Sequence, residues 1–377
     1  MRILFCNDSF PGNFEALAGL LAADSTNEVL FLSTFVRKDF SIPGVSRVRL
    51  RLNRDKGGQE KDAFFLSWEK AYRIGRQTAH TLLHVRESGF VPDMILASSA
   101  DGPGLFLRHV FPESFIVSYF DRWKKMPETK EERDRLKASL SLQSYQMGQS
   151  NLYFILSEWQ RRLFPPMLQK AVRVMPCFVD TDFFSSAACT ESRAENMMKS
   201  DELLVFHIKE QRGESLQHCL SVIADVLSLR PQCRAALCTG RESIRQAWER
   251  AISQWPESLR PRISVELFGS LKEYRDFLCA ATLHIFPDAS AAQPHELLEC
   301  MSCGSLLMVP RNNAHSDFLN VGKNCLEWPD SSIKATTEAV CSALDMKDRL
   351  SFMSSSAREV VYSQFSQKVV LPEHVKA

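Results

Sequence analysis

Residues 2–23, RILFCNDSFPGNFEALAGLLAA, change their hydrophobic pattern in the middle of the stretch. The first part, RILFCN, is a short apolar run, and the last part, FEALAGLLAA, has apolar residues at helical spacing. Between them lies SFPGNF, whose proline and glycine are typical of a tight loop. The stretch therefore predicts a strand, a tight loop and a helix, which together form the first unit of an alternating α/β fold.

The same alternation continues along the rest of the chain. Short apolar runs are separated by longer segments with helical periodicity, and strands joined by helices are expected to be parallel. The strands predicted in the first half are EVLFLS, RVRLRL, DMILASS, FIVSYF and LYFIL, and those in the second half are ELLVFHI, RAALCT, ISVEL, TLHIFPD and SLLMVP. Around residues 176–200 the sequence is small, polar and without strong periodicity, which is typical of a linker. The sequence thus predicts two doubly wound α/β domains with ligands outside the carboxyl ends of their strands.

Length and composition limit the classes of function. A chain of 377 residues is too long for one compact core, which agrees with two domains. Its 46 Lys and Arg balance 45 Asp and Glu, so the charge gives no reason to expect nucleic acid as a partner. The N-terminus MRILFCNDSF has no signal-peptide pattern, and no apolar run is long enough to span a bilayer. We therefore expect a cytoplasmic protein and leave open peripheral contact with the inner face of the cell membrane.

The eleven cysteines are scattered, and an odd number cannot all pair within the chain. Cys300 and Cys303 have CxxC spacing, but no second pair or histidine completes a zinc site. We therefore expect reduced thiols and no metal site. The sequence also lacks the HExxH, GxSxG, GxGxxG and Walker patterns, which leaves little support for a zinc enzyme, a serine hydrolase or a dinucleotide-binding enzyme.

Three strand-to-helix connections carry glycine or cations at the expected binding edge. SFPGNF contains Gly12, which would let the backbone approach a phosphate, although a plain turn is the simpler explanation. HIKEQRG contains Lys209 and Arg212, and two cations beside a helix N-terminus suit a diphosphate. The alternative for this segment is a solvated polar loop. CTGRES repeats the geometry one unit later with Gly240 and Arg241, and it is weak in isolation.

HELLECMSCG, residues 295–304, places carboxylates in a predicted helix that a glycine ends. His295 and Glu296 lie in its first turn, and Glu299 lies four residues after His295 on the same face. His295 is either a surface or capping residue or part of a binding site. Glu299 is either a charge on the solvated face of the helix or a carboxylate directed at a ligand. The local sequence leaves both alternatives open.

Taken together, these stretches resemble a known family. MRILFCNDSFPGNFEALAGLLA is similar to the opening of bacterial retaining glycosyltransferases of the GT-B fold, family four, in the branch that begins with FPGxF. Five further stretches follow in the family's order across nearly the whole chain: PDMILASSADGPGLFLRHVFPES, FIVSYFD, LSEWQRRLFPP, FVDTDFF and ELLECMSCGSLLMVP. One such stretch alone would be weak evidence, whereas six in order are more specific.

The resemblance implies the GT-B fold, with two doubly wound Rossmann-like domains facing a central cleft. It implies transfer of a hexose, with retention, from a nucleotide sugar to a saccharide or lipid-linked glycan, and it implies no metal and no cofactor besides this co-substrate. The residue matching Glu299 binds the ribose hydroxyls in the family, and Lys209 and Arg212 are the local candidates for holding the diphosphate. We take as catalytic residues Lys209, Arg212 and Asp121, and as donor-binding residues Gly12, Gly240, Arg241, His295, Glu296 and Glu299.

The resemblance also sets the expected domains. We predict an acceptor-side domain over 1–175, a linker over 176–200 and a nucleotide-sugar domain over 201–350. A final helix over 351–377 is expected to cross back to the first domain. The proposed setting is the assembly of bacterial surface polysaccharides.

The sequence departs from the family pattern at several positions. Ala291 stands eight residues before Glu299, where a second glutamate is common, and Asn312 and Asn313 replace a glycine pair. The cationic loop after the first strand of the second domain is shorter than usual. These departures favour an alternative, a catalytically weakened relative that binds a nucleotide sugar or a partner protein. A sugar-nucleotide epimerase is a third alternative, but the acid/base carboxylates and histidine that it needs find no place in the sequence.

Overall fold

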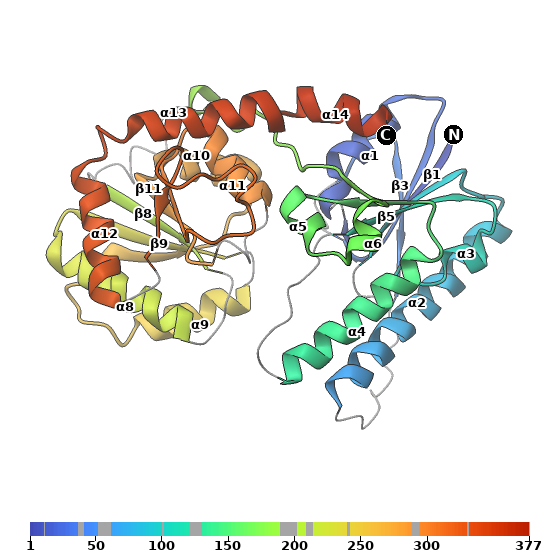
Figure 1. The fold of residues 1–377 in the computed structure, drawn as a ribbon, viewed down its shortest axis with the longest axis horizontal. Helices are drawn as coiled ribbons and strands as arrows, with labels where there is room; N and C mark the ends of the chain where they lie inside the picture. The colour runs from blue at the N-terminus through green and yellow to red at the C-terminus, as the bar shows by residue number, and fades with distance from the viewer. Residues whose placement is uncertain are drawn as a thin grey trace. The chain divides into compact units, whose positions relative to one another are not determined.

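The computed structural model describes residues 1–10, 12–36, 41–51, 62–99, 102–120, 130–188, 202–208, 214–239, 242–288, 294–329 and 332–376. These residues form two compact units, Met1–Met175 and Pro176–Ala377. Each unit contains one parallel sheet with helices on both of its faces (Figure 1). Among the described helices, none combines the length and apolar character needed to cross a membrane.

The first unit is built on a seven-stranded sheet in the order β3-β2-β1-β4-β5-β6-β7. The strands are β1 Arg2–Phe10, β2 Glu28–Val36, β3 Val45–Arg49, β4 Met94–Ser98, β5 Phe115–Phe120, β6 Leu152–Ile155 and β7 Val172–Val174. The helices are η1 Gly12–Phe14, α1 Glu15–Ala23, α2 Ala63–Glu87, α3 Leu107–Val110, α4 Lys130–Met147, α5 Glu158–Arg162 and α6 Pro166–Gln169. The strand order reverses between β1 and β4, which makes their carboxyl ends the switch point where ligands of such sheets bind.

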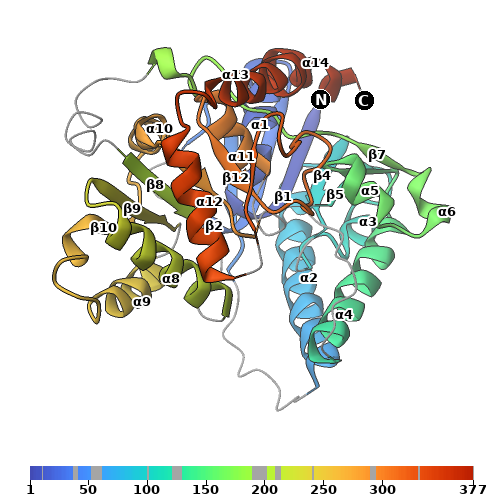
Figure 2. The ribbon, with the colours of Figure 1, turned by 60° about the vertical axis from the view of Figure 1, so that its left-hand side comes forward.

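Both faces of this sheet are covered, which explains its continuous apolar strands. Leu4 and Cys6 of β1 belong to the core beneath α2 and α3. Phe5 points to the opposite face, where its ring lies 5.4 Å from that of Phe14. All of these β1 side chains are buried. Figures 1 and 2 both show α2 beside α4, in agreement with their close packing.

The second unit is built on a six-stranded sheet in the order β10-β9-β8-β11-β12-β13. The strands are β8 Glu202–His207, β9 Cys233–Cys238, β10 Ile263–Glu266, β11 Leu283–Ile285, β12 Leu307–Val309 and β13 Leu326–Glu327. The helices are η2 Ser186–Ala188, α8 Glu214–Leu229, α9 Glu242–Ile252, η3 Arg260–Arg262, α10 Leu271–Ala280, α11 Pro294–Ser302, α12 Ile333–Asp345, α13 Ser351–Val360, η4 Val361–Phe365 and α14 Gln367–Lys376. Here the order reverses between β8 and β11, so their carboxyl ends form the second switch point.

The two faces of the second sheet carry different helices. Leu204 and Phe206 of β8 face the core formed with α8, α9 and α12. Val205 of the same strand points to the opposite face and packs with Phe277 of α10. Figures 1 and 2 show α8, α9 and α12 on one side of the strands and α10 and α11 on the other. The helices that follow β8 and β11 therefore leave the sheet on opposite faces, the arrangement at which doubly wound sheets bind their ligands.

The segment FVDTDFF, residues 178–184, is hydrogen-bonded to the last helices of the second unit. Val179 forms a parallel bridge with Ser366, and the Thr181 hydroxyl lies 3.0 Å from the Ser366 hydroxyl. The Tyr362 hydroxyl donates to the carbonyl oxygen of Thr181. Residues 176–188, the described part of the predicted linker, therefore pack within the second unit. Residues 351–376 also group with this unit, and the predicted crossing of the final helix to the first domain stays a prediction.

One expectation about the cysteines is wrong. Of the cysteines that the structure describes, Cys279 is disulfide-bonded, and the others are free thiols. Cys300 and Cys303 are free and buried, so their CxxC spacing does not form a disulfide.

The Gly102→Ala substitution is expected to lower the free energy of unfolding of the first unit, because residue 102 lies against α2. Its φ is 105°, and a Cβ there would lie 2.2 Å from the carbonyl oxygen of Ala71. The backbone conformation costs roughly 1–2 kcal/mol for alanine, and the clash raises the expected loss of unfolding free energy to about 3 kcal/mol or more. Gly89→Ala is the matched control, since its φ is 97° and no heavy atom lies within 4 Å of the added Cβ. Urea unfolding measures both, and equal losses would show that the close approach to α2 contributes nothing.

Candidate functional site

The switch point of the second unit contains α11, the helix that carries the predicted carboxylates. Leu297, Leu298 and Met301 are fully buried and hold this helix against the sheet. The helix ends at a glycine, Gly304, whose φ is 77° and whose N–H donates to the carbonyl oxygen of Met301. This left-handed position requires glycine and fixes where the chain leaves α11 for β12.

Glu296 and Glu299 lie three residues apart on α11 and are both half-buried. Neither side chain is therefore the fully solvated charge that the simpler interpretation required. Burial raises the pKa of Tyr274 of α10 well above its usual value, and the charges of Glu299, Cys300 and Glu296 raise it further. The Tyr274 phenol is thus held protonated close to two carboxylates. A carboxylate beside a neutral hydroxyl supplies both acceptors and a donor for a ligand with vicinal hydroxyls.

His295 occupies the first turn of α11 and is half-buried. Desolvation lowers its pKa to about 4. The imidazole is therefore neutral at neutral pH and offers one donor and one acceptor, not a positive charge. Such a side chain orients a polar ligand without attracting a phosphate by charge.

The structure brings three predicted donor-site residues together: His295, Glu296 and Glu299 all lie on α11. Gly12 belongs to the first unit, where it begins η1 directly after β1 with a φ of 55°. The remaining predicted residues lie outside the described residues: Asp121, Lys209, Arg212, Gly240 and Arg241. In the sequence, Lys209 and Arg212 follow β8, which is one of the two switch-point strands.

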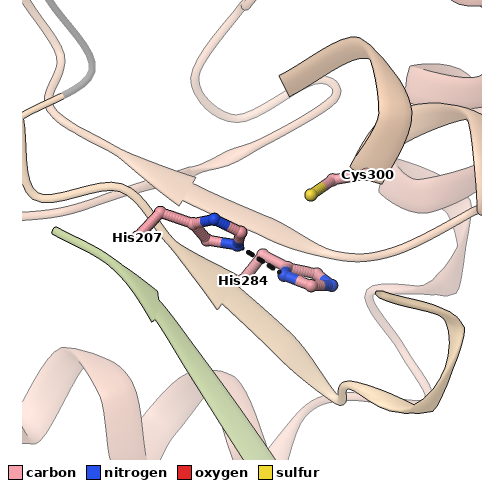
Figure 3. Close-up of side chains that lie close together, drawn as sticks. All are labelled: His207, His284 and Cys300. Atoms are coloured by element: carbon pink, nitrogen blue, oxygen red, sulfur yellow. Dashed lines mark hydrogen bonds between the residues drawn. The ribbon is translucent and has the colours of Figure 1, made fainter. Parts of the chain in front are cut away.

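Two histidines that the sequence interpretation missed lie beneath this edge. His207 is the last residue of β8 and His284 is the middle residue of β11, and both are buried. The His207 Nε2 atom lies 2.9 Å from the His284 Nδ1 atom. Figure 3 marks this hydrogen bond with a dashed line. The His284 Nε2 atom lies 3.0 Å from the carbonyl oxygen of Leu278, which can only accept. Each histidine stands alone in an apolar strand, so only the pairing of β8 with β11 reveals that they meet.

These hydrogen bonds define the protonation of the pair. Desolvation lowers the pKa of His284 to about 4, so its ring is neutral at neutral pH. The His284 proton is on Nε2, where it is donated to Leu278, and the Nδ1 lone pair accepts from His207 Nε2–H. The ring of His207 also stacks on Phe286, with centroids 4.1 Å apart. The pair therefore forms an ordered chain of hydrogen bonds that ends on the backbone of α10.

Comparisons with known proteins agree with this architecture. Residues 25–184 match the family model described as "Glycosyl transferase family 4 group". Sucrose-phosphate synthase from Thermosynechococcus elongatus superimposes with a TM-score of 0.74 at 13% identity, over 100% of this chain and 98% of that chain. The chain has the GT-B fold. The predicted fold class is thereby confirmed.

Two further GT-B structures give the same result. The Anabaena protein HepE, solved in complex with UDP-glucose, superimposes with a TM-score of 0.70 at 12% identity, over 100% of this chain and 98% of that chain. WaaG, a glycosyltransferase involved in lipopolysaccharide biosynthesis, gives a TM-score of 0.70 at 14% identity, over 99% and 98%. At these identities the likeness shows the fold. A search of curated protein sequences gives no match.

The first unit of this GT-B protein has polar groups at its own switch point. Gly12 follows β1, and Ser99 follows β4. Ser99 is buried, its N–H donates to the carbonyl oxygen of Tyr119, and its hydroxyl has no hydrogen-bond partner in the described structure. A buried hydroxyl without a partner is costly unless a ligand or water satisfies it. Each GT-B unit therefore offers polar groups at the edge where ligands of doubly wound sheets bind.

Proposed function

We propose that this protein is a glycosyltransferase that moves a hexose from a nucleotide sugar to a saccharide or lipid-linked glycan, with retention of anomeric configuration. The observation that carries the proposal is the half-buried pair Glu296 and Glu299 beside the protonated Tyr274, at the switch point of the second GT-B unit. This arrangement suits the two hydroxyls of a ribose, which donate to a carboxylate and accept from a phenol.

In the proposed reaction, the bond between the anomeric carbon and the diphosphate oxygen breaks while the acceptor oxygen bonds to the same face of the sugar. The acceptor's proton passes to an oxygen of the leaving diphosphate. Lys209 and Arg212 stabilise the negative charge that develops there. This route needs no pair of catalytic carboxylates, unlike retaining glycoside hydrolysis, and no metal at the reacting atoms. Asp121, which follows β5, is assigned to the side of the transferred sugar.

The acceptor is assigned to the first unit, at the edge of the sheet where Ser99 follows β4. The Ser99 hydroxyl, which has no hydrogen-bond partner among the described residues, supplies one polar contact for a hydroxyl-rich acceptor. A lipid-linked acceptor would require the protein to work at the inner face of the cell membrane. Assembly of surface polysaccharide is the setting that we favour.

Nucleotide binding gives a direct test of the donor site. UDP, GDP, ADP and dTDP are each added at about a hundredfold excess over Kd, and thermal unfolding is recorded. The nucleotide that fits is expected to stabilise the protein by about 2.7 kcal/mol, or roughly 5–10 °C in Tm for a unit of this size. Glu299→Ala should reduce this stabilisation to about 0.3–1.4 kcal/mol at the same nucleotide concentration, because losing charge-assisted hydrogen bonds to the ribose weakens binding roughly 10–150-fold.

Glu338→Ala is the matched control for this experiment. Glu338 is exposed and lies on α12, which is on the other side of the second sheet from α11. The Glu338→Ala protein should keep the full nucleotide shift. If none of the four nucleotides stabilises the wild-type protein, or if the Glu299→Ala protein keeps the shift, Glu299 does not bind a nucleotide sugar.

A further inference from the structure

A cluster of metal-ligand side chains lies between the second sheet and α11. The side chains of His207 on β8 and His284 on β11 share one face, because His284 pairs in register with Val205 and His207 lies two residues after Val205. Cys300 of α11 points toward the two rings from above, as Figure 3 shows. One ring nitrogen of each histidine and the Cys300 Sγ atom lie within 4.8 Å of one another.

The position of this cluster is unusual for polar side chains. Cys300 and His284 are 0% exposed and His207 is 6% exposed. Around them, the same layer contains Val205 and Phe277, which are apolar core residues. A hydrogen-bonded pair of histidines explains two members of the cluster, but it does not explain why a thiol completes it.

The chemistry of the three side chains fits a thiophilic metal ion. Two imidazoles and one thiolate are ligands that Zn²⁺ takes in proteins, at bond lengths of about 2.0–2.3 Å, which place the ligand atoms roughly 3.3–3.6 Å apart. The separation of the histidine nitrogens, 2.9 Å, is slightly shorter, and small side-chain rotations would open it. The hydrogen bond from His284 Nε2–H to the Leu278 carbonyl oxygen is the kind that fixes the tautomer and orientation of a ligating histidine.

The charges around the cluster also favour a cation. Glu299 directly precedes Cys300 on α11, Glu296 lies one turn before it, and both carboxylates are half-buried. Their negative potential stabilises a bound divalent ion. Because the His284 Nε2–H donates to the Leu278 carbonyl oxygen, the His284 Nδ1 lone pair lies on the side of the cluster, as a metal ligand requires.

We propose that His207, His284 and Cys300 bind a structural Zn²⁺ ion that joins β8, β11 and α11 beneath the nucleotide edge. On binding, the Cys300 thiol releases one proton to solvent and Sγ becomes a thiolate ligand. His284 keeps its proton on Nε2, and His207 binds through one ring nitrogen with its proton on the other. The thiolate neutralises one of the two positive charges, and Glu296 and Glu299 lie close to the remaining one. These three side chains would hold the ion, and a water molecule would have to complete its tetrahedral coordination.

This ion would act on the fold and not on the reacting atoms. Residue 299 is adjacent to Cys300 in α11, so an ion that fixes Cys300 against two strands also fixes the backbone that carries Glu299. The inference does not depend on glycosyl transfer, because the metal is measured without donor or acceptor.

The test uses the full chain, produced in zinc-supplemented medium and purified without chelator. Elemental analysis is expected to give about one zinc per chain for the wild type and for Cys303→Ala, and less than about a tenth of that for Cys300→Ala. Cys303 is the matched control because it is also a free, buried thiol and lies one turn further along the chain. Equal zinc in the Cys300→Ala and wild-type proteins would mean an adventitious ion only, and it would overturn the proposal.

A second measurement avoids dependence on a variant that fails to fold. The wild-type chain is unfolded in denaturant that contains a chelator, which removes bound zinc, and is then refolded with Co²⁺ in place of Zn²⁺. Co²⁺ that is bound by a cysteine thiolate gives a thiolate-to-metal absorption band. We expect this absorption at about one Co²⁺ per chain, and we expect added Zn²⁺ to abolish it. The proposal is excluded if the refolded protein shows no such absorption and the purified wild-type protein contains no zinc. His207 and His284 would then form only a hydrogen-bonded pair.

Discussion

Donor turnover is expected to fall about 10²–10³-fold when Lys209 or Arg212 is replaced by alanine, the loss typical of removing one group that stabilises developing charge. Both cations follow β8, one of the two strands at the switch point of the second unit. The charge on the leaving diphosphate grows as the glycosidic bond breaks, so a cation that contacts it stabilises the transition state more than the bound donor. The effect should therefore appear mainly in kcat.

Release of nucleoside diphosphate, measured with a cell extract that contains acceptors, provides the readout. Lys272→Ala is the matched control, since Lys272 is an exposed cation on α10 of the same unit. That variant should keep wild-type turnover. If the protein hydrolyses the donor only slowly, and neither Lys209→Ala nor Arg212→Ala changes this rate, the alternative of a catalytically weakened relative is favoured. Ala291 and the shortened cationic loop would then be changes that accompany the loss of activity.

Most of the fold was predictable because hydrophobic pattern and burial correspond closely. Helix α10, Leu271–Ala280, lies between the predicted strands ISVEL and TLHIFPD, where the alternation of strands and helices predicts a helix. Strand β8 carries the continuous apolar run expected of a strand with both faces covered. Strands β7 and β13 were missed because they are only three and two residues long and lie at the edges of their sheets. Such short strands form by pairing with a neighbour and leave almost no periodicity in the sequence.

The candidate site was predictable only where its residues lie on one helix. The spacing of His295, Glu296 and Glu299 on α11 follows from helical periodicity alone. Tyr274 and the histidine pair come from other segments, and sheet register or helix packing brings them to the same place. No local pattern contains that information. The sequence therefore did not indicate that Cys300 lies beside two histidines.

Arg230→Met is expected to lower the free energy of unfolding of the second unit by about 3–5 kcal/mol, the cost of leaving a buried charge without its partner. The guanidinium donates from Nε to Glu202 Oε2 at 2.7 Å, forms a second bond with Glu202 Oε1, and donates to Asp345 Oδ1 at 2.7 Å. The pKa of Arg230 is raised chiefly by the hydrogen bond to Glu202. Glu202 begins β8 and is 4% exposed, so the solvent cannot replace the lost bonds.

Two further variants test this explanation by urea unfolding. Asp345→Asn should cost less than about 1 kcal/mol, because the Asp345 side chain is 63% exposed and water replaces its bond to Arg230. Adding Glu202→Gln to Arg230→Met should recover much of the loss, because the double variant buries no unpaired charge. If the double variant is as unstable as Arg230→Met alone, the loss comes from packing of the arginine stem. The ion pair would then contribute little to holding the amino end of β8, the strand whose other end leads to Lys209 and Arg212.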